Sequence, residues 1–363
     1  MSDGTHPRGT TSNIRDGLQA LRPCRRFVLI SMATALAAAF ILAACLGAVL
    51  FTPRELFSIV AYGLGFSDSC ACDPIRAKIW LSLRLPRLLL AMLVGAVLAA
   101  GGVIMQGLFR NPLADPSLIG VSAGGGVAAV AVIVLGIPAA WAGFSLLPIA
   151  AFCGSFATML AAYHLARYAG HIDTASLLLA GIAFNALATA TIGFFTLVSS
   201  EQALRSFTFW LLGGFGGADW LQVASAAVFI VPSLVIMLWS ARVLNVFALG
   251  EREALWLGIA VERWKLLLLA AVALGVGASV ALTGIIGFIG LVVPHLLRLL
   301  WGPNHYLLLP CAVLLGALVV LLADLVARVV ILPAELPLGI LTALLGVPLF
   351  LFLLSARRTR VVL

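Results

Sequence analysis

The stretch LLLAMLVGAVLAAGGVIMQGLF, residues 88–109, decides the fold of this chain. It runs for 22 residues between Arg87 and Arg110 without an aspartate, glutamate, lysine or arginine. A helix that crosses a bilayer needs about 20 consecutive apolar residues, and a charge near its centre is costly. The interval therefore predicts one membrane-spanning helix.

The whole chain shares this apolar character. Of its 363 residues, 63% are hydrophobic and only 10% are charged, and the mean hydropathy is +1.16. A soluble domain carries about 25% charged residues. The shortfall excludes a water-soluble fold, so lipid must be the solvent for most of the surface.

Charge-free intervals of similar length recur along the chain, and two of them are long enough to hold two helices. Residues 116–166 offer a turn at Ile137–Pro138, and residues 266–297 break where glycine recurs at 284, 287 and 290 before Pro294. The ten predicted spans lie in 27–53, 88–109, 116–166 (two), 174–200, 220–241, 266–297 (two), 299–323 and 336–356. The sequence thus predicts an all-α, polytopic membrane protein of about ten transmembrane helices.

The distribution of positive charge predicts the orientation. With ten spans both termini lie on one side, and alternate assignment of the loops puts 15 lysines and arginines on that side and 7 on the other. Cytoplasmic loops carry the excess of positive charge. We therefore expect a cytoplasmic tail at 1–26, a membrane domain at 27–356 and a cytoplasmic tail at 357–363.

Three classes of membrane protein compete: a secondary transporter, a channel, and a pump subunit powered by another chain. Carriers usually need ionisable groups near the bilayer midplane. Thirteen of the fourteen acidic residues fall at termini, loops or helix ends; the exception, Asp324, is four residues before Arg328, which predicts a local ion pair. Nothing else resembles a proton relay, so the carrier interpretation is weak.

The chain lacks the residues for chemistry of its own. A phosphate-binding loop needs a lysine after glycine, but Lys78 and Lys265, the only lysines, follow alanine and tryptophan. Any ATP chemistry therefore belongs to a partner, and we assign no catalytic residue. The six cysteines form neither a zinc pattern nor a disulfide framework, and Cys70 and Cys72 are interpreted as an incidental pair.

The longest cytoplasmic connection, residues 242–265, contains a short amphipathic segment of mixed charge between Gly250 and Gly258. Such a helix suits the cleft of a cytosolic partner, to which it would transmit motion. A connector lying on the membrane surface fits the pattern equally well.

Five motifs, in order from about residue 80 to 355, resemble the FecCD-type permeases. These are the membrane subunits of binding-protein-dependent ABC importers for ferric siderophores, haem and cobalamin. The motifs are Leu83-Arg-Leu-Pro-Arg with 101–120, Gly287-Phe-Ile-Gly-Leu-Val-Val-Pro-His295, Ala323-Asp-Leu-Val-Ala-Arg328, Glu335-Leu-Pro-Leu-Gly339 and Gly346-Val-Pro-Leu-Phe350.

The resemblance implies a homodimer in the bacterial inner membrane, with two cytoplasmic ATP-binding subunits and a periplasmic substrate-binding protein. ATP and Mg would be held by the partner, and this chain would bind no cofactor, no metal and no nucleic acid. The loop matches the family's coupling segment at Gly250, Glu251, Arg252, Glu253, Ala254, Leu257 and Gly258.

The resemblance also implies arginines that dock the binding protein. Arg84, Arg87 and Arg328 occupy matching positions at the outer ends of their spans. In the alternative without docking, Arg84 and Arg87 anchor a helix end at the lipid headgroups, and Asp324 holds Arg328.

Gate residues are expected around residues 167–175 and in the span that follows, with Arg167, Asp173 and Thr174 as candidates. Gln106, near the inner end of its span, either lines the path or hydrogen-bonds the turn at Asn111–Pro112. Asn185, a polar group in an apolar span, either joins helices or faces the path.

The substrate is less well defined. Residues 204–220, LRSFTFWLLGGFGGADW, resemble haem permeases in their first part and cobalamin permeases in their glycine-rich part. The expected order is haem, then ferric siderophore, then cobalamin. A stand-alone carrier or channel is the alternative from another class.

Overall fold

The computed structural model describes residues 25–63, 73–137, 140–141, 144–168, 171–331 and 334–361. Residues 1–24 of the predicted N-terminal tail, Cys70, Cys72 and Pro138 lie outside these described residues. Helices dominate the described chain, which confirms the all-α fold class.

Ten apolar helices correspond to the ten predicted spans. Within the described residues, seven helices are long and apolar enough to cross a membrane, and three shorter apolar helices accompany them. The ten are α2 (Arg25–Cys45), α5 (Leu85–Leu108), α6 (Val121–Val134), α7 (Leu146–Ala166), α8 (Thr174–Val198), α10 (Trp220–Trp239), α13 (Val261–Thr283), α14 (Ile289–Trp301), α15 (His305–Val329) and α16 (Leu338–Val361).

Short elements connect these spans. They are the α-helices α3 (Pro53–Gly63), α4 (Pro74–Ile79), α9 (Glu201–Leu211), α11 (Ala241–Phe247) and α12 (Glu251–Trp256), the π-helical η1 (Trp80–Arg84) and the 3₁₀ turn η2 (Pro116–Ile119). Two antiparallel hairpins join β1 (Ala140–Trp141) to β2 (Phe144–Ser145) and β3 (Arg167–Tyr168) to β4 (His171–Ile172).

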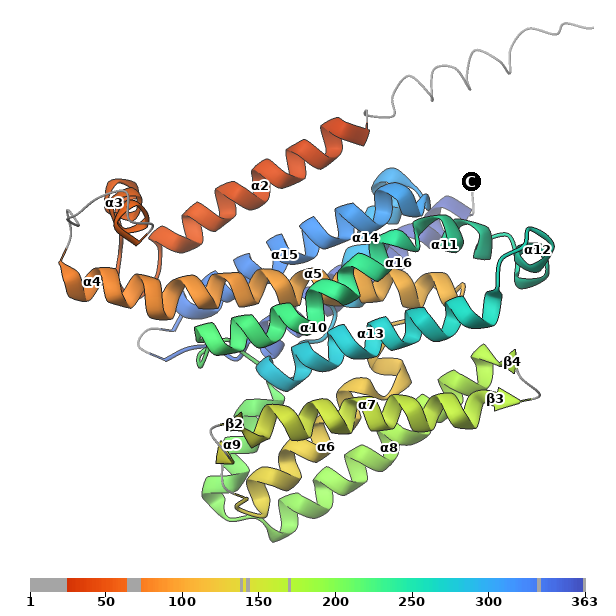
Figure 1. The fold of residues 1–363 in the computed structure, drawn as a ribbon, viewed down its shortest axis with the longest axis horizontal. Helices are drawn as coiled ribbons and strands as arrows, with labels where there is room; N and C mark the ends of the chain where they lie inside the picture. Colours follow the sequence, from red (N-terminus) through yellow and green to blue (C-terminus); the bar gives the residue numbers. More distant parts are fainter. Residues whose placement is uncertain are drawn as a thin grey trace, which may run out of the picture.

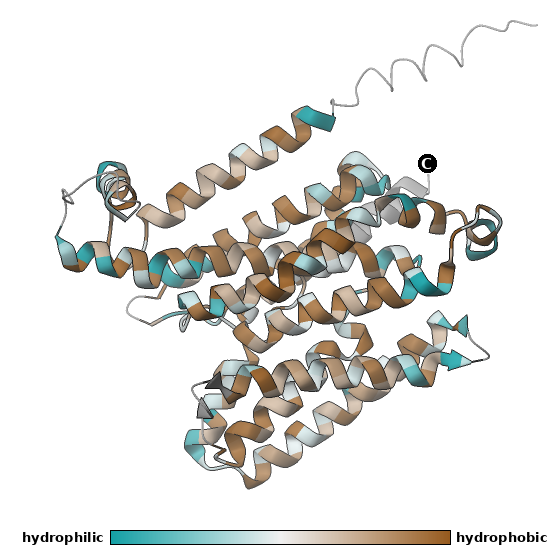
Figure 2. Ribbon diagram, in the orientation of Figure 1, coloured by the Kyte–Doolittle hydropathy of each residue, from teal (hydrophilic) through white to brown (hydrophobic). Residues whose placement is uncertain are grey.

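The spans form a bundle around α5, which packs against α10, α13, α14 and α15 (Figure 1). Helices α6, α7 and α8 form a second group, joined to the first mainly through α13 and α7. Hydrophobic residues cover most of the helical surface, and hydrophilic ones collect at helix ends and in the connecting elements (Figure 2). This distribution is that of a protein whose middle lies in lipid.

Glycines let α5 approach its neighbours closely. A Cβ atom built at Gly95 would collide with the backbone of Gly316 on α15, and one built at Gly102 would collide with the carbonyl of Gly290 on α14. Small residues drive helix association in lipid, where burial of apolar surface gives little advantage. These contacts fix the position of α5 in the bundle.

Polar caps set where several spans begin. The side chains of Asp173, Asp219 and Asn304 accept hydrogen bonds from the first amides of α8, α10 and α15. The predicted starts at 174 and 220 are confirmed. The predicted start at 299 is wrong for α15, because α14 continues to Trp301 and α15 begins only after the Asn304 cap.

The break within 266–297 is confirmed, but it lies at 284–288 and Pro294 is inside α14. Other boundaries differ from the prediction. α2 ends at Cys45 and not near 53, because Thr52 and Glu55 cap a separate helix, α3: the Thr52 amide donates to Glu55 (2.8 Å) and the Glu55 amide to Thr52 (3.3 Å). This Thr-x-x-Glu capping box was readable in the sequence.

Two spans also extend beyond their charge-free intervals. Continuous helix precedes Arg87 from Pro74 onward, and α15 passes through Asp324 to Val329. Arg87, Asp324 and Arg328 are tolerated there because they pair with one another, and Arg84 donates to backbone carbonyls. At the C-terminus, α16 continues to Val361, so most of the predicted tail 357–363 is helical.

Replacing Gly95 by alanine should destabilise the bundle. Its Cβ would meet backbone atoms of Gly316, which cannot rotate away, so we expect a loss of about 1–3 kcal/mol. Thermal unfolding of the purified protein measures the loss. Gly193→Ala on α8 is the matched control, because that Cβ meets nothing within 4 Å. Equal effects of the two variants would contradict the close-approach argument.

Candidate functional site

The predicted coupling segment forms a short helix at one end of the molecule. α12 follows Gly250, whose φ is 141°, and ends before Gly258, whose φ is 79°. Residues other than glycine rarely adopt such backbone φ angles. The two glycines thus bracket the helix as predicted, and α12 projects at the right of Figure 1.

α12 presents an apolar surface. Ala254 is fully buried and anchors the helix, while Leu255, Trp256 and Leu257 are exposed, Trp256 to 89%. Arg252 and Glu253 are exposed beside them. Exposed apolar patches rimmed by polar residues mark interaction sites. The geometry therefore suits contact with another protein.

A buried lysine joins this segment to the predicted gate. Lys265, only 3% exposed, places its Nζ atom 2.7 Å from Glu251 and 3.6 Å from Glu262, and donates to the carbonyl of Ile172 at 3.1 Å. Glu262 also accepts from the Ile172 amide at 2.9 Å. α12, α13 and β4 therefore meet at one charged junction, which we call the Lys265 junction.

The gate candidates lie directly beyond this junction. Arg167 is exposed on β3, Asp173 follows β4, and Thr174 is the first residue of α8. Hydrogen bonds from Ser176 lower the pKa of the Asp173 carboxyl and hold it charged as the cap of α8. A displacement of β4 would thus act on the start of α8.

Sequence reasoning missed Lys265 as a member of the candidate site. Its spacing from Glu262, three residues earlier, indicated an ion pair on α13. Its contacts with Glu251 and Ile172 carried no local signal, because they depend on how the loop and the hairpin pack.

Gln106 and Asn185 both contact neighbouring backbone. Gln106 is buried at the end of α5 with its Nε2 atom 3.4 Å from the carbonyls of Gly290 and Leu291. Asn185 donates to the carbonyl of Ser117 at 3.1 Å. These hydrogen bonds of Gln106 are thus with α14 and not with the turn at Asn111–Pro112, and Asn185 joins α8 to η2; a role of either residue in the path stays a prediction.

The predicted docking arginines lie at the other end of the molecule, and Arg84 points inward. It is 8% exposed and donates to the carbonyls of Ala44 (3.0 Å) and Val49 (2.7 Å), with Phe51 beneath its guanidinium. Arg84 therefore holds the segment after α2 against η1.

Arg87 and Arg328 converge on one buried carboxylate. Asp324, 1% exposed, lies 2.8 Å from Arg87 and 3.0 Å from Arg328. The predicted Asp324–Arg328 pair is confirmed. Arg87 also binds Glu335 at 2.8 Å, and Glu335 is 47% exposed. We call this group the outer charge cluster.

The cluster limits how the arginines can dock a partner. All three guanidinium groups are engaged within the chain, so an acidic partner would compete with Asp324 or Glu335 for Arg87. Docking by Arg84, Arg87 and Arg328 stays a prediction. The partnership of Arg87 with Asp324 and Glu335 was missed, because it spans more than 200 residues.

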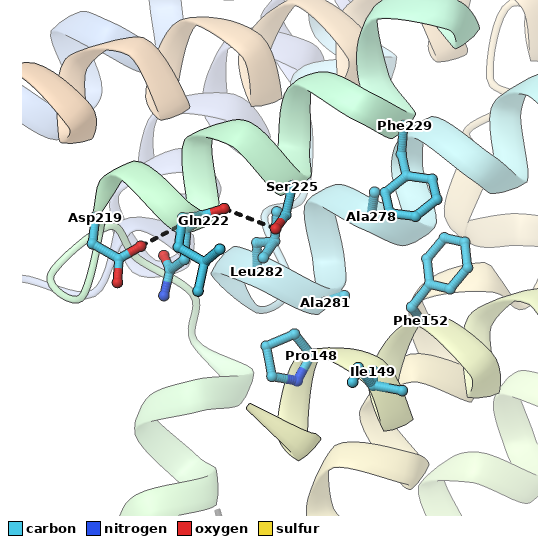
Figure 3. Close-up of a pocket in the computed structure, with 11 residues that line it drawn as sticks. Pro148, Ile149, Phe152, Asp219, Gln222, Ser225, Phe229, Ala278, Ala281 and Leu282 are labelled. Carbon is cyan, nitrogen blue, oxygen red and sulfur yellow. Dashed lines mark hydrogen bonds between the residues drawn. The ribbon is translucent and has the colours of Figure 1, made fainter. Parts of the chain in front are cut away.

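An apolar pocket of about 380 Å³ lies between α7, α10 and α13 (Figure 3). Phe152 and Phe229 face each other across it with ring centroids 5.0 Å apart. Its polar residues are Asp219, Gln222 and Ser225, of which Asp219 and Ser225 make side-chain hydrogen bonds within α10 and its cap. Among the described residues there is also no group of three histidines, cysteines or acids placed to hold a metal. The pocket suits hydrocarbon and not acid–base chemistry.

The profile of the FecCD transport family matches residues 35–356. The chain belongs to the FecCD transport family. The hemin transport system permease protein HmuU of Yersinia pestis is 48% identical over 282 residues, which cover 77% of this chain and 84% of that protein. The vitamin B12 import system permease protein BtuC of Salmonella typhimurium is 44% identical over 284 residues, with the same coverage.

A solved structure agrees with these relatives. An inward-facing conformation of a metal-chelate type ABC transporter superposes with a TM-score of 0.78 at 32% identity, covering 91% of this chain and 99% of that chain. The protein is thus a multi-span permease of an ABC importer and not an enzyme. In this family a separate subunit hydrolyses ATP, and a binding protein is a further partner.

Asp324→Asn should destabilise this FecCD permease strongly. The change removes the counter-charge shared by the buried Arg328 and the half-buried Arg87, and only Arg87 keeps another acid, Glu335. We expect a cost of about 3–5 kcal/mol, mainly from the unpaired Arg328. Glu335→Gln is the control, because an exposed pair contributes about 0–1 kcal/mol. Denaturant or thermal unfolding of both variants measures the difference in stability. An Asp324→Asn variant as stable as the unmodified protein would refute the importance of the cluster.

Proposed function

We propose that this permease carries haem (hemin) or another iron chelate from the periplasm to the cytoplasm by ATP-driven alternating access. It acts as a homodimer in the bacterial inner membrane, with both termini cytoplasmic. Two ATP-binding subunits hold ATP and Mg, and a periplasmic binding protein delivers the substrate. The excess of 15 lysines and arginines over 7 supports this orientation.

The Lys265 junction is the observation that carries the mechanism. Its ammonium group contacts Glu251 of α12 and the carbonyl of Ile172, and Asp173 then caps α8. Motion imposed on α12 by an ATPase therefore has a direct route to the hairpin and to α8. A loop that merely lay on the membrane would need no such connection.

The path and gate follow from this route. Arg167, Asp173 and Thr174 move with the hairpin and the start of α8, while Gln106 and Asn185 keep neighbouring helices in register. Arg87 and Arg328 receive acidic residues of the binding protein, and Arg84 stiffens the same end. The chain itself contributes no cofactor.

Haem is the preferred substrate because a hemin permease is 48% identical, against 44% for a vitamin B12 permease. The Leu204-Arg-Ser-Phe-Thr-Phe-Trp210 segment supports the same choice. Ferric siderophores and cobalamin are alternatives within the family. A stand-alone carrier is the alternative from another class.

Uptake by proteoliposomes tests the proposal. The permease and its cognate ATPase are reconstituted and offered hemin, a ferric siderophore or cobalamin on the matching binding protein. We expect ATP-dependent uptake of hemin. Trp256→Ala should weaken binding of the ATPase about tenfold, because a large exposed aromatic is truncated at the interface.

Trp239→Ala is the control for that variant, since Trp239 is exposed on α10, outside α12. Uptake without the ATPase would contradict the importer mechanism and favour a carrier. Uptake of cobalamin alone would change the assigned substrate to cobalamin and leave the proposed mechanism unchanged.

Lys265→Met tests transmission separately from assembly. The variant removes the ammonium group while α12 keeps its exposed face, so the ATPase should still bind and hydrolyse ATP. We expect the hairpin to loosen by about 1–3 kcal/mol, seen as faster hydrogen exchange at 171–172, and uptake to fall. Arg263→Met, which removes an exposed charge two residues away, should change neither. Full uptake by Lys265→Met would exclude the junction as the route.

A further inference from the structure

A second, larger groove opens on the surface of three spans. It measures about 690 Å³ and lies between α2, α10 and α15, extending to the first residue of α11. Leu29, Leu238, Pro310 and Leu314 are among its apolar walls. Because α2, α10 and α15 are all candidate membrane spans, the groove opens toward lipid.

The groove has the length of a lipid leaflet. Its lining runs from Arg25 to residue 33 on α2 and from Tyr306 to Leu314 on α15. Eight residue steps of helix correspond to about 12 Å, close to the ~15 Å of one hydrocarbon leaflet. Both lined segments begin at the helix starts, so the groove reaches from the membrane surface toward the midplane.

Positive charge lies only at its mouth. Arg25 is the single charged residue among the described lining residues, and Tyr306 adds a hydroxyl at the same end. Arg26 and Arg242, both exposed, follow the lining residues Arg25 and Ala241 in sequence. Figure 2 shows the hydrophilic start of α2 next to its apolar length.

In the part of the chain that the structure describes, no acid lies close enough to pair with this charge. Among the described residues, neither Arg25, Arg26 nor Arg242 makes an ion pair, and no aspartate or glutamate lines the groove. A guanidinium group binds a phosphate through two parallel hydrogen bonds, and a tyrosine hydroxyl can donate a third. Basic pockets between spans select anionic headgroups.

We propose that this groove is a binding site for an anionic glycerophospholipid. The phosphodiester binds Arg25 and Tyr306, and one acyl chain lies along Leu29 and Leu314. The lipid fills the groove between α2, which lies at the outer edge of the bundle (Figure 1), and its neighbours α10 and α15. The pocket of Figure 3 has no basic residue in its lining and is not selective in this way.

Native mass spectrometry of the purified full-length permease tests the site. The protein is delipidated in detergent and titrated with phosphatidylglycerol or with phosphatidylcholine of the same acyl chains. We expect about one phosphatidylglycerol retained per chain, and Arg25→Gln should reduce this retention about fivefold, the effect of one basic residue at an anionic surface. Arg205→Gln is the control, because it removes an exposed arginine of α9, far from the groove.

A second variant tests the acyl chain. Ala33→Trp fills the groove from an exposed position without changing charge, so it should also reduce retention. Three results would overturn the proposal. The first is equal retention of phosphatidylglycerol and phosphatidylcholine, and the second is an equal loss of phosphatidylglycerol in Arg25→Gln and Arg205→Gln. The third is full retention of phosphatidylglycerol by Ala33→Trp. A change of oligomeric state in Ala33→Trp with lipid retained would place a second copy in the groove and overturn it as well. None of these readouts depends on transport.

Discussion

The close approach of α5 to its neighbours is the constraint on which the rest of the bundle depends. Helices in lipid gain little from burying apolar side chains, so they hold together where backbones can touch. Gly95 meets Gly316 on α15, and Gly102 meets Gly290 on α14. Because α5 is fixed from two sides, its ends are fixed too, and the outer charge cluster and the turn before η2 inherit their positions from it.

Within the described spans, charged residues lie near the helix ends, where they join elements that are distant in sequence. At one end Asp324 brings Arg87 and Arg328 together, and Glu335 adds the start of the last span. At the other end Lys265 brings together α12, α13 and β4. A buried charge is tolerated only with its partner. Each cluster therefore makes several elements move as one, which is what a transporter needs at the points where partners bind.

The two ends differ in what they offer to a partner. α12 shows large apolar side chains to its surroundings, whereas the arginines of the outer charge cluster are already engaged by acids of the same chain. A partner at α12 would therefore bind through apolar surface, whereas a partner at the outer end would have to exchange one ion pair for another. Both features agree with a FecCD permease of an ABC importer.

The sequence by itself determined the order of the apolar helices and their approximate number, the break near residue 284, the helix between Gly250 and Gly258, and the Asp324–Arg328 pair. Each of these depends on local properties: the length of an apolar run, the backbone freedom of glycine, or a spacing of one helical turn. Only the tertiary structure decided that Arg87 joins Asp324, that Lys265 reaches Ile172, and that Arg84 turns inward. These contacts link residues 35 to 237 positions apart. Helix packing brings them together, and no local pattern encodes it.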